Sequence, residues 1–108
     1  MYEQRDIILI PFPYSDLTGA KLRPALILSN NKLNKTKDRL CCLITSNETR
    51  EGILIENKHF DEGKLPFRSW LKCHRLFTVN ENIIKKKLCK IKHELHKVII
   101  KDLNLLIE

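Results

Sequence analysis

Polar residues at the ends of two apolar runs could act on a phosphodiester. Arg23 follows a polar loop that contains Pro and Gly, and Pro24 fixes the backbone directly after it. A planar guanidinium can donate two hydrogen bonds to a phosphate and stays charged through a pentavalent intermediate. Thr45 closes a second run and is followed by Ser46 and Asn47. Spacing alone also fits a surface arginine and ordinary turn formers, so the surrounding sequence must decide.

A later segment alternates between two kinds of side chain. A period of two places Trp70, Lys72 and His74 on one face of a strand, and Leu71 and Cys73 on the other. The second face is typical of a core, whereas a cation and an imidazole in a row are costly to bury unpaired. Imidazole has an ordinary pKa of about 6.5 and suits proton transfer at neutral pH, although a lone strand histidine is more often a surface or hydrogen-bonded residue. Trp70 could stack on a base, pack across a dimer interface or lie in the core.

Short apolar runs between polar loops predict the elements that position these residues. Four runs are expected to be strands: 6–11, 23–29, 39–45 and 52–56. Residues 83–91 fit either a further strand or the start of a helix. Residues 93–107 repeat apolar side chains at helical spacing and predict a C-terminal amphipathic helix, on which His93 and His96 are expected to face solvent. No linker or repeat interrupts residues 1–108, so a single domain is expected.

The charge of the chain favours an anionic partner. The net charge is +7, which is typical of proteins that bind a polyanion or an acidic protein. Residues 85–101 carry seven Lys and one Glu, a run that is either a solvated face or a surface for RNA or an antitoxin. The first loop contains Tyr14, Ser15, Asp16 and Lys21. Such a mixture suits contacts with splayed single-stranded bases, but it also fits an ordinary polar connection.

The four cysteines do not indicate a metal or cofactor site. They lie at positions 41, 42, 73 and 89, without a Cys-x-x-Cys pair or a histidine at zinc-ligand spacing. Cys41 and Cys42 are adjacent and must point to opposite faces of a strand. We expect all four to be reduced and buried in a cytoplasmic protein, since no signal peptide and no membrane-spanning apolar run is visible.

Residues 6–29 read DIILIPFPYSDLTGAKLRPALILS. This stretch resembles the beginning of the MazF/PemK (Kid-like) family of bacterial and archaeal toxins, in which a first strand leads through a loop to an Arg-Pro-Ala-Leu-Val-like strand. Residues 69–79 are similar to the family segment Val-Arg-Cys-Asp-Gln-x-Arg-Thr, with Lys72 and His74 in place of its Arg and Asp. The resemblance implies a small, mainly antiparallel β-barrel of SH3-like character with a C-terminal α-helix, which assembles as a homodimer.

The resemblance also implies a function. It is that of the toxin of a type II toxin–antitoxin pair, a metal-independent endoribonuclease (mRNA interferase) that leaves 2′,3′-cyclic phosphate and 5′-hydroxyl ends. Arg23 would stabilise the transition state, Thr45 would orient the phosphate, and His74 with Lys72 or Arg23 would transfer protons. The residues expected to contact RNA are Tyr14, Ser15, Asp16, Lys21, Ser46, Asn47, Trp70 and Arg75.

The implied partners are single-stranded RNA and a cognate antitoxin with an acidic tail, with operator DNA bound only through the antitoxin complex. Two alternatives remain open. The same fold serves toxins that bind DNA gyrase and cleave nothing, although the chain lacks their C-terminal Trp-Gly-like ending. A degenerate member that only binds antitoxin or DNA would fit the departures at Lys72 and His74.

Overall fold

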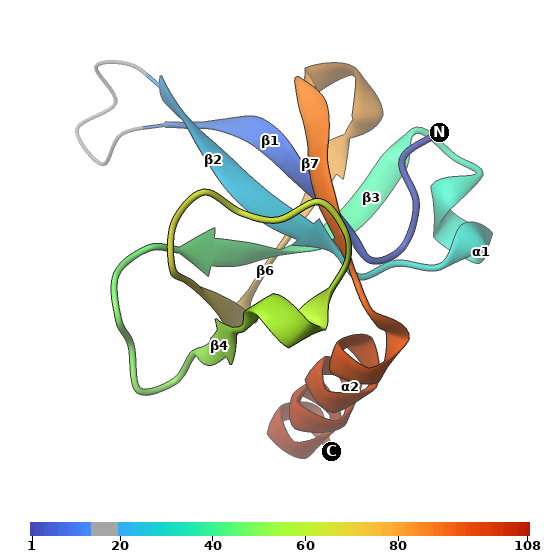
Figure 1. Cartoon of the computed structure of the whole chain (residues 1–108). Coiled ribbons are helices and arrows are strands. Elements are labelled where there is room, and N and C mark those ends of the chain that lie inside the picture. Colours follow the sequence, from blue (N-terminus) through green and yellow to red (C-terminus); the bar gives the residue numbers. More distant parts are fainter. Residues whose placement is uncertain (14–19) are drawn as a thin grey trace.

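The computed structural model describes residues 1–13 and 20–108 of the chain. Within these residues seven strands form one antiparallel sheet in the order β4-β6-β3-β2-β1-β7-β5 (Figure 1). The strands are β1 (Asp6–Pro13), β2 (Ala20–Ile27), β3 (Asp38–Thr45), β4 (Ile53–Ile55), β5 (Phe60–Glu62), β6 (Ser69–Asn80) and β7 (Lys86–Ile91). The helices are α1 (Asn31–Asn34), α2 (His93–Ile107) and two short 3-10 turns, η1 (Asn57–His59) and η2 (Glu81–Ile83).

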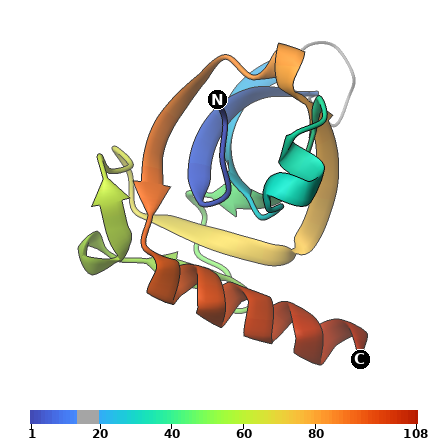
Figure 2. The ribbon, with the colours of Figure 1, turned by 90° about the vertical axis from the view of Figure 1, so that its right-hand side faces the viewer.

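The sheet curls into a half-barrel with a core on each face. Figure 2 shows the central strands wrapped around a small interior, with α2 lying outside them. Alternation along β1 sends Ile8 into the inner cluster and Ile7 into the outer one, which packs against Leu95 and Ile99 of α2. The sheet order begins at β4 and ends at β5, so the barrel stays open between these edge strands. The expected mainly antiparallel barrel with a C-terminal helix is confirmed.

The cysteines pack as the sequence predicts. Cys41 belongs to the inner cluster and its neighbour Cys42 to the outer one, because successive residues of β3 face opposite sides of the sheet. Cys73 and Cys89 join the outer cluster. All four thiols are free and buried.

The C-terminal helix has the predicted bounds, but one of its residues was placed wrongly. Leu95 and Ile99 lie one turn apart and are buried against the sheet, whereas Val98 is exposed. His93 is exposed as expected, but His96 is buried, with 6% of its surface accessible. His96 stands three residues before Ile99 and therefore shares the face that packs on the barrel.

The remaining elements depend on contacts between distant residues. Residues 83–91 resolve into the end of η2 and strand β7, which pairs with β1 on one side and β5 on the other. The single turn of α1 is capped by Asn30, whose side chain accepts a hydrogen bond from the backbone N–H of Lys32 at 3.0 Å. No helix in the described part of the chain is both long and apolar enough to span a bilayer.

Candidate functional site

Strands β2 and β3 separate where Arg23 and Thr45 lie. The last antiparallel pair between these strands is Ala25 with Leu43. Continuing the same register by two residues places Arg23 opposite Thr45 and on the same face of the sheet. Both residues are half-buried. Two residues that are far apart in the sequence thus meet at the point where the ladder opens.

Both residues line one cavity of about 380 Å³. Its polar and charged lining residues are Lys21, Arg23, Thr45, Ser46, Ser69 and Lys86. Apolar residues from β1, β2, β3, β7 and the β5–β6 loop complete the wall. Among the described residues, no Asp or Glu lines this cavity. Three cations and several hydroxyl groups without a carboxylate are suited to bind an anion such as a phosphate.

The hydroxyl group of Thr45 has a fixed hydrogen-bond partner. The backbone N–H of Asn47 donates a hydrogen bond to Oγ1 of Thr45 at 3.1 Å, because the chain turns directly after β3. A hydroxyl that accepts from this N–H keeps its own proton to donate elsewhere. Thr45 can therefore donate a hydrogen bond to an oxygen bound in the cavity.

Trp70 and Lys72 lie on the sheet face that carries Thr45. Thr45 pairs with Trp70 across β3 and β6, and Leu43 pairs with Lys72. Lys72 is therefore diagonal to Thr45, within reach of a long side chain. The guanidinium carbon of Arg68 lies 5.6 Å from the centre of the Trp70 ring. Arg68 covers one face of the indole in a cation–π contact.

The expectation that His74 continues this face is wrong for the single chain. Lys72 and Leu76 pair with the adjacent residues Leu43 and Cys42, so residues 73–75 form an insertion in β6. Alternation continues through Cys73, which joins the outer cluster with Leu71, and is lost at His74. His74 is exposed and lines a different cavity, of about 370 Å³, together with Asp102 of α2. The structure does not bring His74 to the cavity of Arg23.

The other expected RNA contacts are divided between several places. Lys21 and Ser46 line the cavity, and Asn47 is exposed directly beside it. Arg75 is exposed within the β6 insertion, next to His74. Tyr14, Ser15 and Asp16 lie outside the described residues.

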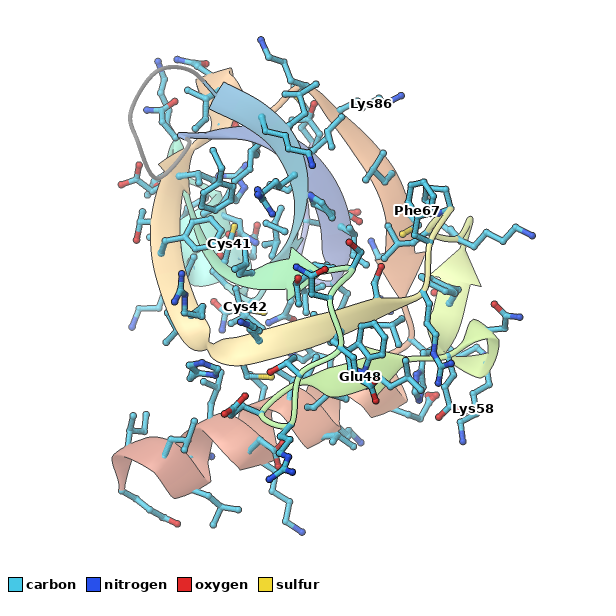
Figure 3. All side chains as sticks on the ribbon, turned by 90° about the vertical axis from the view of Figure 1, so that its left-hand side faces the viewer. Cys41, Cys42, Glu48, Lys58, Phe67 and Lys86 are labelled. Atoms are coloured by element: carbon cyan, nitrogen blue, oxygen red, sulfur yellow. The ribbon has the colours of Figure 1, made fainter. Side chains whose placement is uncertain are left out.

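Sequence reasoning missed several residues of the cavity wall, among them Lys86 and Phe67. Lys86 begins β7, and Phe67 lies in the loop between β5 and β6. Figure 3 shows both side chains on the same side of the barrel. The signal for Phe67 was an aromatic residue between Pro66 and Arg68 in a polar segment, where a core position is not expected. Nothing local links Lys86 to Arg23, since β7 reaches the cavity only through its pairing with β1.

The described residues offer no alternative metal centre. Within residues 1–13 and 20–108, no group of three or more His, Cys, Asp or Glu side chains is arranged to hold a metal ion.

The carboxylate of Glu51 lines the same cavity as His74, together with that of Asp102. Its pKa is lowered first by a hydrogen bond from the hydroxyl group of Thr49, at 2.6 Å, and further by the positive charges of His74 and Lys72. Glu51 is therefore an anion at neutral pH.

Comparisons with solved structures find the same fold in bacterial toxins. The MazE–MazF complex (Form-III) from Deinococcus radiodurans superposes with a TM-score of 0.78 at 15% identity, covering 98% of this chain and 95% of that chain. The Mycobacterium tuberculosis toxin MazF-mt6 has a TM-score of 0.68 at 15% identity, with 91% and 90% covered. An endoribonuclease in complex with its cognate antitoxin from Mycobacterial species has a TM-score of 0.67 at 14% identity, with 93% and 88% covered. At these identities the likeness establishes the fold.

The family follows from the sequence as a whole. No curated protein sequence matches the chain significantly. The family model described as PemK-like, MazF-like toxin of type II toxin–antitoxin system matches residues 3–107. The match includes both strands that meet at the cavity and the whole of β6. The chain therefore belongs to the family of PemK-like, MazF-like toxins of type II toxin–antitoxin systems.

Proposed function

We propose that this protein is an endoribonuclease that cleaves single-stranded RNA at the cavity between β2 and β3. The observation that carries the proposal is the meeting of Arg23 and Thr45 in a cavity that also contains Lys21 and Lys86 and, among the described residues, no carboxylate. Such a site binds the phosphate of a nucleic acid backbone. The family match and the endoribonuclease named among the structural relatives support cleavage as the outcome of that binding.

The chemistry that fits this site is an internal transesterification. The 2′-hydroxyl of the substrate attacks the adjacent phosphorus, so that the bond from O2′ to phosphorus forms and the bond from phosphorus to O5′ breaks. The products carry a 2′,3′-cyclic phosphate and a 5′-hydroxyl. The 2′-hydroxyl loses one proton and O5′ gains one, so the reaction consumes no water and needs no external nucleophile.

Each residue has a role in this scheme. The guanidinium of Arg23 binds two phosphate oxygens and stabilises the extra negative charge of the phosphorane. The hydroxyl of Thr45, held by the N–H of Asn47, donates to one of the two nonbridging phosphate oxygens and fixes the orientation of the phosphate. Lys72 lies diagonal to Thr45 on the same face, and we assign it the donation of the proton to O5′.

The same cavity fits the partner that a toxin of this family requires. An acidic segment of a cognate antitoxin would be attracted to Lys21, Arg23 and Lys86 and would exclude RNA from them. Operator DNA would then be bound only through the antitoxin complex. The exposed apolar residues of α2, including Leu105, Leu106 and Ile107, leave surface that a homodimer could cover.

Cleavage of RNA in excess EDTA tests the proposal. The wild-type protein should cut single-stranded RNA, and the new 5′ ends should accept phosphate from polynucleotide kinase without prior phosphatase treatment. Arg23→Ala should lower kcat/KM by about 100-fold or more, the usual cost of removing a donor to a developing oxyanion. The kcat/KM of Arg23→Lys should lie between those of the wild type and Arg23→Ala, because a lysine keeps the charge but loses the planar fork.

Lys35→Ala is the matched control. Lys35 is an exposed cation at the end of α1, which Figure 1 shows on the opposite side of the barrel from the first residues of β2. Its removal changes the net charge as Arg23→Ala does, but it should leave kcat/KM unchanged. Full activity of Arg23→Ala would reject the site. Intact RNA together with inhibition of DNA gyrase by the wild-type protein would favour the gyrase-binding alternative instead.

A further inference from the structure

Phe67 is an exposed aromatic residue beside the cavity. It exposes 73% of its surface, and it is the one aromatic residue among the exposed large apolar side chains of the described residues. An aromatic ring of this size is normally buried or covered by a partner. The position of Phe67 is therefore costly in water and indicates a contact that the isolated chain does not make.

The other aromatic rings near this end of the barrel are already in contact with protein. Phe12 and Phe77 meet edge to face with ring centroids 4.9 Å apart. One face of the Trp70 ring is covered by the guanidinium of Arg68. Among these residues, only Phe67 presents an exposed ring.

Phe67 stands between two cavities. It lines the cavity of Arg23 and Thr45, and it also lines a second cavity of about 520 Å³ between β4, η1 and the β5–β6 loop. The two cavities share the loop residues Leu65, Pro66 and Phe67 as a common wall. A chain that crosses from one cavity to the other passes over this shared wall, to which Phe67 contributes the exposed ring.

The backbone that carries Phe67 is held in place. The hydroxyl group of Ser69, a buried residue, donates a hydrogen bond to the carbonyl oxygen of Phe67 at 2.8 Å. The loop leaves β5 through Gly63, which has a φ of 65° that favours glycine. A ring on a fixed backbone loses little conformational freedom when a ligand stacks on it.

We propose that Phe67 is the stacking platform for an unpaired base of the RNA next to the scissile phosphate. The proposal rests on the RNA substrate proposed above. With a phosphate bound at Arg23 and Thr45, the neighbouring nucleotide reaches the shared wall, and its base covers the Phe67 ring and enters the second cavity. There Asn57 and Lys64 lie within the lining and can contact the base or its phosphate.

The positive charge around Phe67 favours RNA over an apolar protein partner at this position. Lys64 and Arg68 flank Phe67 within the second cavity, and Lys86 lies in the first. Glu56 is the carboxylate of the second cavity, but its side chain is engaged in the capping box at the start of η1. A flat ring between cations is the arrangement with which proteins hold single-stranded nucleic acid without reading its sequence.

Binding of a noncleavable RNA tests the platform directly. The probes are fluorescein-labelled 2′-O-methyl oligonucleotides of each of the four bases, and Kd is measured by fluorescence anisotropy. Phe67→Ala should raise Kd about 10-fold, within the range found when stacking aromatics are removed. Phe67→Trp should restore binding to the wild-type level or better. Ile83→Ala removes an apolar side chain of η2 that is 42% exposed and should leave Kd unchanged.

Abasic substitutions separate stacking from indirect effects. In the tightest-binding oligonucleotide, each base is removed in turn. At one position the loss should abolish the difference between wild type and Phe67→Ala, because the ring then has no base to hold. Equal Kd values for the two proteins would overturn the proposal, as would a difference that persists with every abasic probe. A change of oligomeric state in Phe67→Ala with unchanged Kd would assign the ring to a protein interface instead.

This experiment is independent of catalysis. The 2′-O-methyl probes lack the attacking hydroxyl, so a wild-type protein that cleaves no RNA but binds these probes through Phe67 would reject the nuclease and keep the platform. A wild-type protein that cleaves RNA with the same KM as Phe67→Ala would keep the nuclease and reject the platform.

Discussion

Oδ1 of Asp6 lies 3.2 Å from Nζ of Lys90, and both side chains are buried. Asp6 begins β1 and Lys90 is its partner in β7, so the ion pair joins the two strands at the base of the barrel. Oδ2 of Asp6 accepts a hydrogen bond from the backbone N–H of Glu3 at 2.9 Å. Oδ1 has no hydrogen bond of good geometry, so Lys90 and the more distant Lys87, at 3.4 Å, compensate its charge. Such a pair is costly to break from one side.

Lys90→Ala should lower the free energy of unfolding by about 3 kcal/mol, because it leaves the buried carboxylate of Asp6 with the more distant Lys87 alone. Urea denaturation followed by circular dichroism measures the change. Lys87→Ala is the matched control. Lys87 is 33% exposed and also pairs with the exposed Glu62, so its loss should cost less than about 1 kcal/mol. Equal losses of unfolding free energy in the two variants would show that the buried Lys90 contributes no more to stability than the more exposed Lys87.

The buried His96 should make the protein less stable in acid. Burial lowers the pKa of His96, and the positive charges of His93 and Arg5 lower it further. Nδ1 of His96 has no hydrogen-bond partner among the described residues. The folded state therefore prefers the neutral ring. This contribution is complete above the unfolded pKa of about 6.5 and is lost as the pH falls through the lower folded pKa.

His96→Leu should flatten the fall in unfolding free energy that the wild type shows on the acid side of about pH 6.5, since leucine does not titrate. Parallel urea titrations across that range measure the slope. His93→Leu removes an exposed histidine of the same helix and should change the slope much less, because it takes away only the charge effect on His96 and leaves its burial in place. An identical pH dependence in wild type and His96→Leu would contradict the assignment.

The strands and the main helix could be predicted because their signals are local. The apolar runs around Ile8 and Leu26 and the helical spacing of Leu95 and Ile99 each lie within one element. His96 was placed wrongly because a polar residue on an amphipathic helix is expected outside the core. The burial of His96 depends on how α2 packs on the sheet, and this packing cannot be deduced from the sequence of the helix alone. The pairing of the buried Lys90 with Asp6 likewise depends on register between distant strands.

The candidate site could be predicted only in part. Arg23 and Thr45 are at strand ends that the sequence marks with a loop or a turn, and the register then brings them together. His74 was expected on the face of Lys72 because alternation was continued through β6. The insertion of residues 73–75 changes that face, and the segment contains no glycine or proline that would have indicated it in the sequence. Phe67 was missed because exposure of an aromatic residue is a property of the folded loop.

The buried thiols should resist alkylation. Burial raises the pKa of Cys41 to about 12, and those of Cys73 and Cys89 to about 11. Burial also raises the pKa of Cys42 well above its ordinary value. Because only the thiolate reacts, iodoacetamide at pH 8 should leave the native protein unmodified and should label all four cysteines in urea. Mass spectrometry counts the labels, and rapid labelling of the native protein would contradict this prediction.

The same shifts predict a loss of stability in alkali. Unfolded thiols ionise from about pH 8.5, whereas the folded thiols stay protonated to a higher pH. Their contribution is therefore complete below about pH 8.5 and is lost as the pH rises through the folded values of about 11 and 12. Comparison of wild type with Cys41→Ala isolates one thiol from the lysines and tyrosines that titrate in the same range. The variant should show the shallower fall.

Lys72 and His74 should differ in their effect on RNA cleavage. Lys72 shares the sheet face of Thr45, whereas His74 lies in the insertion and lines the cavity next to α2. Lys72→Met should lower kcat by about 100-fold, within the range for loss of a proton donor, and should change KM less. His74→Asn should stay within a few-fold of wild type and keep its pH–rate profile. Loss of activity in His74→Asn together with a shifted pH–rate profile would show that His74 takes part in the reaction. That result would require a second chain to bring its ring to the cavity, and mixed dimers of His74→Asn with Arg23→Ala would then regain one active site in complementation.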